Sequence, residues 1–201
     1  MKGLILKDLY MVKAYLRAFL ILMAGFIVMS AFSAENAFFL FYPAILAGSM
    51  PFTLIAYDER SKWNQYCGVL PVSRKAVVSA RYIIALGFFL AVFILTAILQ
   101  LFSPIFTPQS YAANLCLLVV MGLLTPTVLL PLTFRFGVEK GRLFYYVIIG
   151  VFCALSATAA NISDFYVRLP TAPLFILPVL TLVLFAVSWL ISIRIYERKE
   201  H

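Results

Sequence analysis

Long apolar runs alternate with short polar segments along most of the chain. A helix that crosses the hydrocarbon core of a bilayer, about 30 Å thick, needs about 20 apolar residues at about 1.5 Å rise per residue. The run at residues 82–134 carries no charged residue and is too long for one helix, but polar residues and prolines at 103–110 divide it. The pattern therefore predicts six membrane-spanning helices, at about residues 18–34, 37–57, 82–102, 111–134, 143–162 and 174–193.

The first sixteen residues predict a helix of a different kind. An apolar stripe runs through residues 2–16, while the basic residues lie mostly off it. This arrangement is typical of a helix that lies in the membrane interface with its lysines near anionic head groups. The alternative is that the segment is simply the water-exposed start of the first span. The stripe consists of Ile5, Leu9, Val12 and Leu16.

The polar segment at residues 58–81 is the longest in the chain and has internal order. Apolar side chains recur in it at i, i+3, i+4 and i+7, which places them on one face of a helix. Pro71 ends that helical turn, and Ser73 can cap the next helix. We predict a short amphipathic helix outside the membrane, and a solvated connecting loop is the alternative. The apolar face consists of Trp63, Tyr66, Cys67 and Leu70.

Five prolines lie inside the predicted spans. Each removes a backbone hydrogen bond and lets a helix kink or part from its neighbour. The sequence leaves open whether these prolines gate a path or only shape packing. They are Pro43, Pro51, Pro126, Pro131 and Pro178.

Composition supports a membrane protein of the all-α class. Of the 201 residues, 64% are hydrophobic and 12% are charged, whereas an ordinary soluble domain is roughly 45–50% apolar and about 25% charged. One polytopic transmembrane domain over residues 1–201 is the expected organisation. The three cysteines stand far apart and predict neither a disulfide framework nor a metal site. The N-terminus shows no cleavage site of a removable signal peptide.

The formal charge of +8 reflects topology rather than nucleic-acid binding. The basic residues lie at the ends of apolar runs, without an aromatic-interleaved patch. With six spans, fifteen of the sixteen Lys and Arg residues fall on one side of the membrane, and Arg168 alone falls on the other. Because basic loops face the cytoplasm, we predict that both termini and the loops at residues 58–81 and 135–142 are cytoplasmic.

The predicted spans contain no catalytic or ion-carrying chemistry. No Asp, Glu, Lys, Arg or His lies inside them, and a charge at mid-membrane costs roughly 2.5–3.5 kcal/mol on insertion scales. This disfavours a secondary carrier, and the lack of nucleophile or metal motifs disfavours a membrane-embedded enzyme. The chain also lacks the G-x-x-x-x-G-K-[ST] phosphate loop, so energy for any work has to arrive through a partner on the cytoplasmic side.

At this level the chain resembles a known family. The six predicted spans, the N-terminal helix and a first loop reading YDERSKWNQY and then LPVSRK resemble the permease subunits of ABC-2 type exporters. The resemblance is strongest to the small bacterial permeases of the phenol-soluble modulin exporters. It implies that the loop at residues 58–75, between helices 2 and 3, carries a coupling helix that docks on a separate ATPase. By this resemblance the coupling interface consists of Glu59, Arg60, Ser61, Lys62, Trp63, Asn64, Gln65 and Tyr66, with a lesser contact from Arg135, Glu139 and Lys140.

The resemblance also implies the function. The chain is expected to be the permease of an ATP-driven exporter in the bacterial plasma membrane, working as two copies with two ABC ATPase subunits. ATP and Mg²⁺ belong to the ATPase, and this chain holds no cofactor or metal and binds no nucleic acid. The implied cargo is an amphipathic or hydrophobic peptide. The alternatives are an ABC exporter of a lipid, antibiotic or polysaccharide, and a stand-alone channel or secondary carrier.

Overall fold

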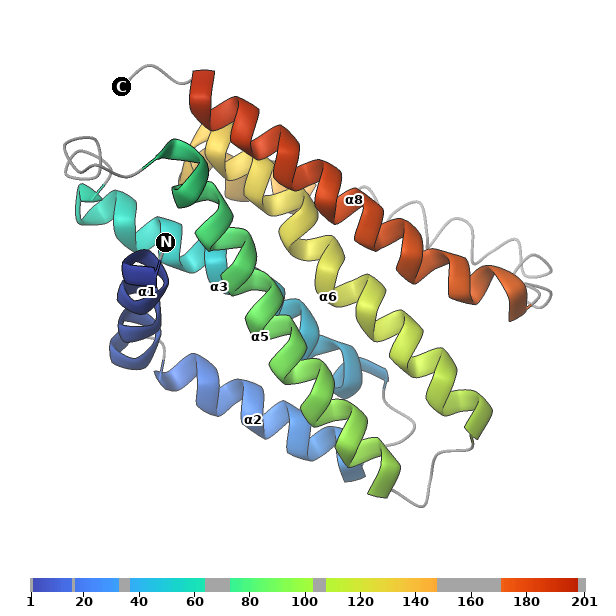
Figure 1. Cartoon of the computed structure of the whole chain (residues 1–201). Coiled ribbons are helices and arrows are strands. Elements are labelled where there is room, and N and C mark those ends of the chain that lie inside the picture. The colour runs from blue at the N-terminus through green and yellow to red at the C-terminus, as the bar shows by residue number, and fades with distance from the viewer. Residues whose placement is uncertain are drawn as a thin grey trace.

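The computed structural model of the protein describes residues 2–15, 17–32, 37–63, 73–102, 108–147 and 171–198. These residues form helices and contain no strand, which confirms the all-α class (Figure 1). A further helical segment covers residues 138–147. The named helices are α1 (Lys2–Tyr15), α2 (Arg17–Phe32), α3 (Ala37–Arg60), α5 (Arg74–Phe102), α6 (Pro108–Phe136) and α8 (Thr171–Arg198).

The count of six spans is not confirmed. Three helical stretches within the described residues are long and apolar enough to cross a membrane, namely Arg74–Leu101, Asn114–Phe136 and Ile176–Arg198. The predicted spans at 18–34 and 37–57 correspond to α2, of 16 residues, and α3, of 24 residues. Most of the predicted span at 143–162 lies outside the described residues.

The helix α6 is central to the packing. It lies between α3 and α8, while α5 packs beside both α3 and α8, and α2 packs on α3 (Figure 1). The main buried cluster is built from side chains of α3, α5, α6 and α8. Its largest member is Tyr82 of α5, whose hydroxyl lies 2.8 Å from Ser188 Oγ and 2.7 Å from Ser192 Oγ of α8. The buried hydroxyl group of Tyr82 therefore has hydrogen-bond partners, which a polar group needs in the interior of a membrane protein.

Two prolines of α6 contribute directly to this packing. Pro131 has no N–H for the carbonyl of Thr127, four residues earlier. Ser188 of α8 donates a hydrogen bond to that carbonyl at 2.7 Å. Pro126 similarly frees the carbonyl of Gly122, and α3 approaches there so closely that a Cβ on Gly48 would lie 2.5 Å from that oxygen. At these two positions the freed carbonyls serve helix–helix contacts.

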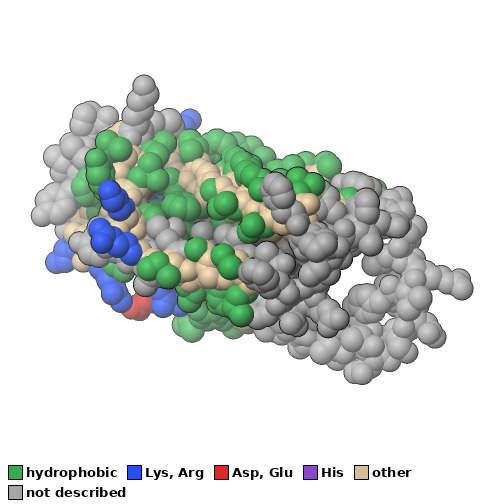
Figure 2. Space-filling view, turned by 90° about the horizontal axis from the view of Figure 1, so that it is seen from below, with side chains coloured by type: hydrophobic (Ala, Val, Ile, Leu, Met, Phe, Trp, Pro, Cys, Tyr) green, Lys and Arg blue, Asp and Glu red, His purple; other side chains and the backbone are tan. Residues whose placement is uncertain are grey.

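The charged side chains gather at one end of the bundle. The start of α5 and the ends of α3, α6 and α8 lie there, and the start of α1 is on the same side (Figure 1). Figure 2 shows the Lys and Arg side chains at this end and mainly hydrophobic side chains beyond it. We call it the charged end. The helix α1 also lies at this end, and whether it rests in a membrane interface stays a prediction.

The connection between α3 and α5 is shorter than the polar segment of the sequence. The helix α3 continues through Asp58 to Arg60, and α5 begins at Arg74, so that Arg81 lies in its second turn. The start of α5 confirms the predicted cap at Ser73, whose Oγ accepts a hydrogen bond from the Ala76 N–H at 3.3 Å. The helix α3 instead continues past the predicted span end at residue 57, and its Asp58 pairs with Arg81 within the bundle.

Candidate functional site

Four charged side chains from three helices meet at the charged end in a buried ion-pair network. Arg81 of α5 pairs with Asp58 of α3, and its Nη1 lies 2.7 Å from Asp8 Oδ2 of α1. Lys7 Nζ lies 2.7 Å from Asp58 Oδ1 and 3.4 Å from Asp8 Oδ1. Asp8 is 1% exposed, and Asp58 and Arg81 are each 4% exposed. The network fixes α1 against α3 and α5.

The formal charges of the four groups in the network balance one another. Two carboxylates face one guanidinium and one ammonium group, and buried charges persist only when they are paired. Burial nevertheless raises the pKa of Asp8 above its ordinary value of 3.8. The attraction of Arg81 and Lys7 opposes this shift, and repulsion by Asp58 adds to it.

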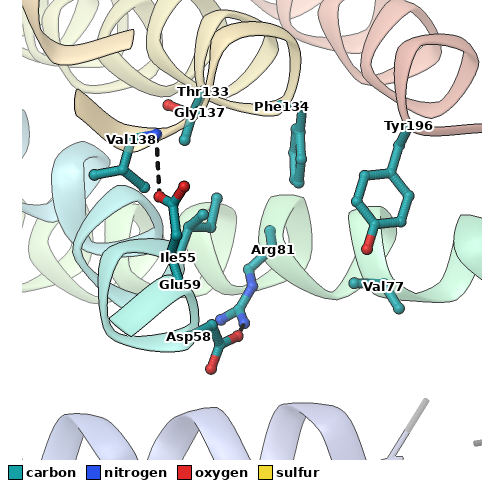
Figure 3. Close-up of a pocket in the computed structure, with 10 residues that line it drawn as sticks. All are labelled: Ile55, Asp58, Glu59, Val77, Arg81, Thr133, Phe134, Gly137, Val138 and Tyr196. Atoms are coloured by element: carbon teal, nitrogen blue, oxygen red, sulfur yellow. Dashed lines mark hydrogen bonds and ion pairs between the residues drawn. The ribbon is translucent and has the colours of Figure 1, made fainter. Parts of the chain in front are cut away.

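Glu59, the residue after Asp58, contacts a different part of the chain. Its Oε2 accepts a hydrogen bond from the backbone N–H of Val138 at 3.2 Å, drawn as a dashed line in Figure 3. Val138 opens the helical segment 138–147, whose first N–H groups lack partners within the helix. Gly137 makes this turn possible with a φ of 83°, and its N–H closes α6 on the Thr133 carbonyl at 2.9 Å. Glu59 therefore joins the end of α3 to the turn after α6.

A small cavity of about 60 Å³ lies between these two sets of contacts. In Figure 3, Asp58 and Arg81 point toward each other on one side of it, and Glu59 points toward Val138 on another. Phe134 of α6 and Tyr196 of α8 complete the wall and lie with ring centroids 5.6 Å apart. The start of α5 and the ends of α3, α6 and α8 thus meet at one junction.

A larger groove of about 420 Å³ lies outside this junction. It runs between the last turn of α3 and the turn that opens the segment 138–147. Its floor is partly apolar and its rim carries charges of both signs, with basic groups in excess. The lining residues are Ala56, Glu59, Arg60, Phe136, Gly137, Val138, Glu139, Lys140 and Arg142.

The groove unites several of the residues that the sequence assigned to the coupling interface. Glu59 and Arg60 come from the last turn of α3, and Glu139 and Lys140 come from the segment 138–147. Arg135, at the end of α6, does not line the groove; its guanidinium lies 5.2 Å from the centroid of the Phe136 ring.

The remaining predicted residues follow α3. Ser61 and Lys62 form a turn in which Lys62 has a φ of 56°. Trp63 is half-buried, with Lys7 Nζ 4.2 Å from the centroid of its ring. Asn64, Gln65 and Tyr66, together with Cys67 and Leu70 of the predicted amphipathic face, lie outside the described residues.

Sequence reasoning missed the ion-pair network and part of the groove. One signal for the network was present, because Asp8 is the only acidic residue before Glu35 and stands in an apolar-rich segment. No sequence pattern pairs it with Arg81, since the two residues belong to different helices. The groove residues Gly137, Val138 and Arg142 were also unassigned, although a glycine between two apolar runs is a signal for a helix end.

Within the described residues, no group of three or more His, Cys, Asp or Glu side chains is arranged so that it could hold a metal ion. The described residues do form a junction of helix ends and a groove between two segments of the charged end.

Comparison with known proteins gives one positive result. The model of the ABC-2 family transporter protein matches residues 3–197, nearly the whole chain. No curated protein and no solved structure matches at a significant level. With its apolar helices and its charged end, the chain belongs to the ABC-2 transporter family and is a membrane permease component of an ABC transporter.

Proposed function

We propose that the chain is the permease of an ATP-driven exporter and that the groove at the charged end receives the ATPase subunit. The observation that carries this proposal is the hydrogen bond from Val138 N–H to Glu59. It joins the two segments that the sequence assigned to ATPase contact into one surface around one groove. A partner in that groove would act on α3 and on the segment 138–147 together.

The junction gives this surface a route to the remaining helices. Glu59 holds the turn after α6, while its neighbour Asp58 pairs with Arg81 of α5 and Lys7 of α1. We infer that a displacement of the end of α3 is transmitted through these contacts to three other segments, namely the turn after α6, α5 and α1. We infer that ATP binding and hydrolysis on the partner move these helix ends as a unit.

The finer features of the proposal rest on the resemblance of the loop sequence YDERSKWNQY to permeases of the phenol-soluble modulin exporters. They are two permease copies with two ATPases, an amphipathic or hydrophobic peptide as cargo, and a bacterial plasma membrane with both termini in the cytoplasm. Exposed apolar side chains along α5 and α8 support a chain surrounded by lipid or by a second copy. ATP and Mg²⁺ would bind the ATPase, with no cofactor on this chain. Export of a lipid or antibiotic, and a stand-alone channel or carrier, remain the competing functions.

The test compares two charge reversals in a complex with the cognate ATPase. Lys140→Glu changes the rim of the groove, while Lys13→Glu makes the same change on an exposed residue of α1, away from the groove. Lys140→Glu should weaken ATPase co-purification about tenfold, equivalent to about 1.4 kcal/mol. Lys13→Glu should leave it nearly unchanged.

The same preparation tests the transport class. Candidate amphipathic peptides should stimulate ATP turnover of the parent complex. A permease that co-purifies with no ATPase, and that conducts ions or solutes alone, would favour the channel or carrier instead. Equal effects of the two charge reversals would remove the groove as the docking surface.

A further inference from the structure

A second hollow, of about 180 Å³, adjoins the groove on the side of α3. It shares Ala56, Arg60 and Arg142 with the groove, and Thr53 and Tyr57 complete it. Arg60 ends α3, and Arg142 lies one turn into the segment 138–147. Two guanidinium groups therefore border one small hollow between two helices.

The side chain of Arg142 lies against an aromatic ring. Its guanidinium carbon lies 5.2 Å from the centroid of the Phe52 ring, two turns below Arg60 on α3. An arginine stacked on an aromatic face loses part of its rotamer freedom and presents its N–H fork in the plane of the guanidinium. The contact holds one of the two cations at the hollow before any ligand arrives.

Both cations lack an acidic partner among the described residues. Arg81 pairs with Asp8 and Asp58, and Lys75 lies 3.7 Å from Glu197. No described carboxylate lies within ion-pair distance of Arg60 or Arg142. Like charges at one hollow repel, and an anion between them converts this repulsion into attraction.

The hollow lies where the apolar surface begins. Four of the five side chains after Arg142 are large and exposed, and Leu143 and Val147 are 65% and 61% exposed. On the other side lies the charged end, where Lys and Arg side chains gather (Figure 2). In a membrane protein this boundary corresponds to the level of the lipid head groups.

We propose that this hollow binds the head-group phosphate of an anionic phospholipid. Arg60 and Arg142 would hold the phosphate oxygens, since guanidinium groups bind phosphate through paired N–H donors. The acyl chains would run along the exposed apolar face of the segment 138–147. Basic pockets between helices are suited to such head groups, and the hollow has less than half the volume of the adjoining groove. The proposal does not depend on an ATPase partner.

The test uses the purified permease alone, without ATPase, in neutral detergent. Binding of phosphatidylglycerol and of phosphatidylcholine with the same acyl chains is measured by native mass spectrometry and by thermal stabilisation. The parent should prefer phosphatidylglycerol at least about tenfold, and Arg142→Gln and Arg60→Gln should each remove most of this preference. The control, Arg135→Gln, makes the same change on a stacked, exposed arginine outside the hollow and should retain it.

Three results would overturn the proposal. A loss of preference in Arg135→Gln equal to that in Arg142→Gln would indicate a diffuse effect of surface charge. Competition by inorganic phosphate at the same concentration as lipid would indicate a site for free phosphate. A variant Arg142→Gln that keeps its lipid preference but no longer co-purifies with the ATPase would assign the hollow to an acidic segment of that partner.

A fourth variant distinguishes a loss of lipid binding from a failure of the protein to fold. Arg142→Lys keeps the positive charge but loses the planar fork. It should fold and bind phosphatidylglycerol with a preference between those of the parent and Arg142→Gln. One combination of results would contradict the proposal. In it, a well-folded Arg142→Lys shows no preference for phosphatidylglycerol over phosphatidylcholine, while Arg60→Gln retains the parent's preference. The two arginines would then not bind one ligand.

Discussion

Arg81 is the single residue on which the junction depends most. It is 4% exposed and is the buried cation between the carboxylates of Asp8 and Asp58. Arg81→Gln would leave both carboxylates facing Lys7 alone. Removing one partner from a buried ion pair costs about 3–5 kcal/mol. We expect a loss of this order in the free energy of unfolding, measured by detergent-denaturant titration.

Asp8→Asn is the matched variant at the same network. It leaves Arg81 paired with Asp58, and it mimics the protonated form that burial already favours in Asp8. We expect a change within about 1 kcal/mol at neutral pH, because burial already disfavours the charged form of Asp8 and Arg81 keeps Asp58 as its partner. A loss as large as that of Arg81→Gln would show that the network is not organised around the arginine.

The pH dependence of Asp8 has a definite sign. Burial raises its pKa above 3.8 in the folded protein, so the folded state holds this proton more tightly than the unfolded state. The stabilising contribution is fully present below pH 3.8 and is lost as pH rises through the raised pKa. Parent and Asp8→Asn should therefore converge in stability at low pH and differ most at neutral pH. A difference that grows on acidification would contradict this assignment.

Trp63 tests the coupling assignment at the level of one side chain. It follows the turn after α3 and is half-buried, with Lys7 Nζ 4.2 Å from its ring centroid. Aromatic anchors in partner pockets cost about 2 kcal/mol or more when truncated, roughly thirtyfold in affinity. Trp63→Ala should weaken ATPase co-purification by that factor, and Lys62→Ala should have a smaller effect. If both variants bind the ATPase as the parent does, the first loop is not the coupling element.

At the level of helices, α3 and α6 approach each other closely at Gly48. A Cβ on Gly48 would lie 2.5 Å from the Gly122 carbonyl oxygen and 2.8 Å from Pro126 Cδ. Both atoms are fixed to the backbone of α6, so neither can move away without a shift of the helix. Gly48→Ala should therefore force the helices apart and cost about 1–3 kcal/mol, as overpacking does.

Gly87→Ala on α5 is the control for this crossing. Nothing lies within 4 Å of the Cβ that it would add, so only the gain in helix propensity remains, about 0.5–1 kcal/mol. The two variants should shift the thermal unfolding midpoint in opposite directions. A Gly48→Ala protein as stable as the parent would show that the crossing is wider than described.

The helices were the most predictable part of the fold, and their contacts were the least. Uncharged runs located α5, α6 and α8, because a bilayer admits few other structures. The sequence placed the start of α5 correctly after Ser73. It failed at Asp58, which lies inside α3 beyond the predicted span end, because its pairing with Arg81 of another helix leaves no pattern along the chain. It also left the role of Pro131 open. The hydrogen bond from Ser188 to the Thr127 carbonyl favours packing at that position.

For the candidate site, the resemblance to ABC-2 permeases named residues in two loops but not how those loops lie relative to each other. Glu59, Arg60, Glu139 and Lys140 were selected from two loops, and the structure arranges them around one groove. The bond that unites them depends on Gly137, whose φ of 83° turns the Val138 N–H toward Glu59. Such a contact across 79 positions leaves no periodic pattern in the sequence.

At the scale of the molecule, the charged side chains lie at one end of the helices, and the orientation of this end relative to the membrane can be tested directly. Among the described residues, the charged side chains of α3, α5, α6 and α8 gather at the charged end (Figure 2). Basic residues near the ends of spans are retained in the cytoplasm. The helix α6 runs from Pro108 to Phe136, about 43 Å at about 1.5 Å per residue. Its two ends should therefore lie on opposite sides of the membrane.

The measurement is labelling of single cysteines with a membrane-impermeant maleimide in intact cells, after replacement of Cys67, Cys116 and Cys153. Gln109→Cys, at the start of α6, should react from outside. Lys140→Cys, past its end, should react only after the membrane is permeabilised. The pair is its own control, because both positions lie close to one helix that crosses the membrane once. Labelling of both from outside would contradict a span at α6, and the reverse pattern would place the groove and its ATPase on the wrong side of the membrane.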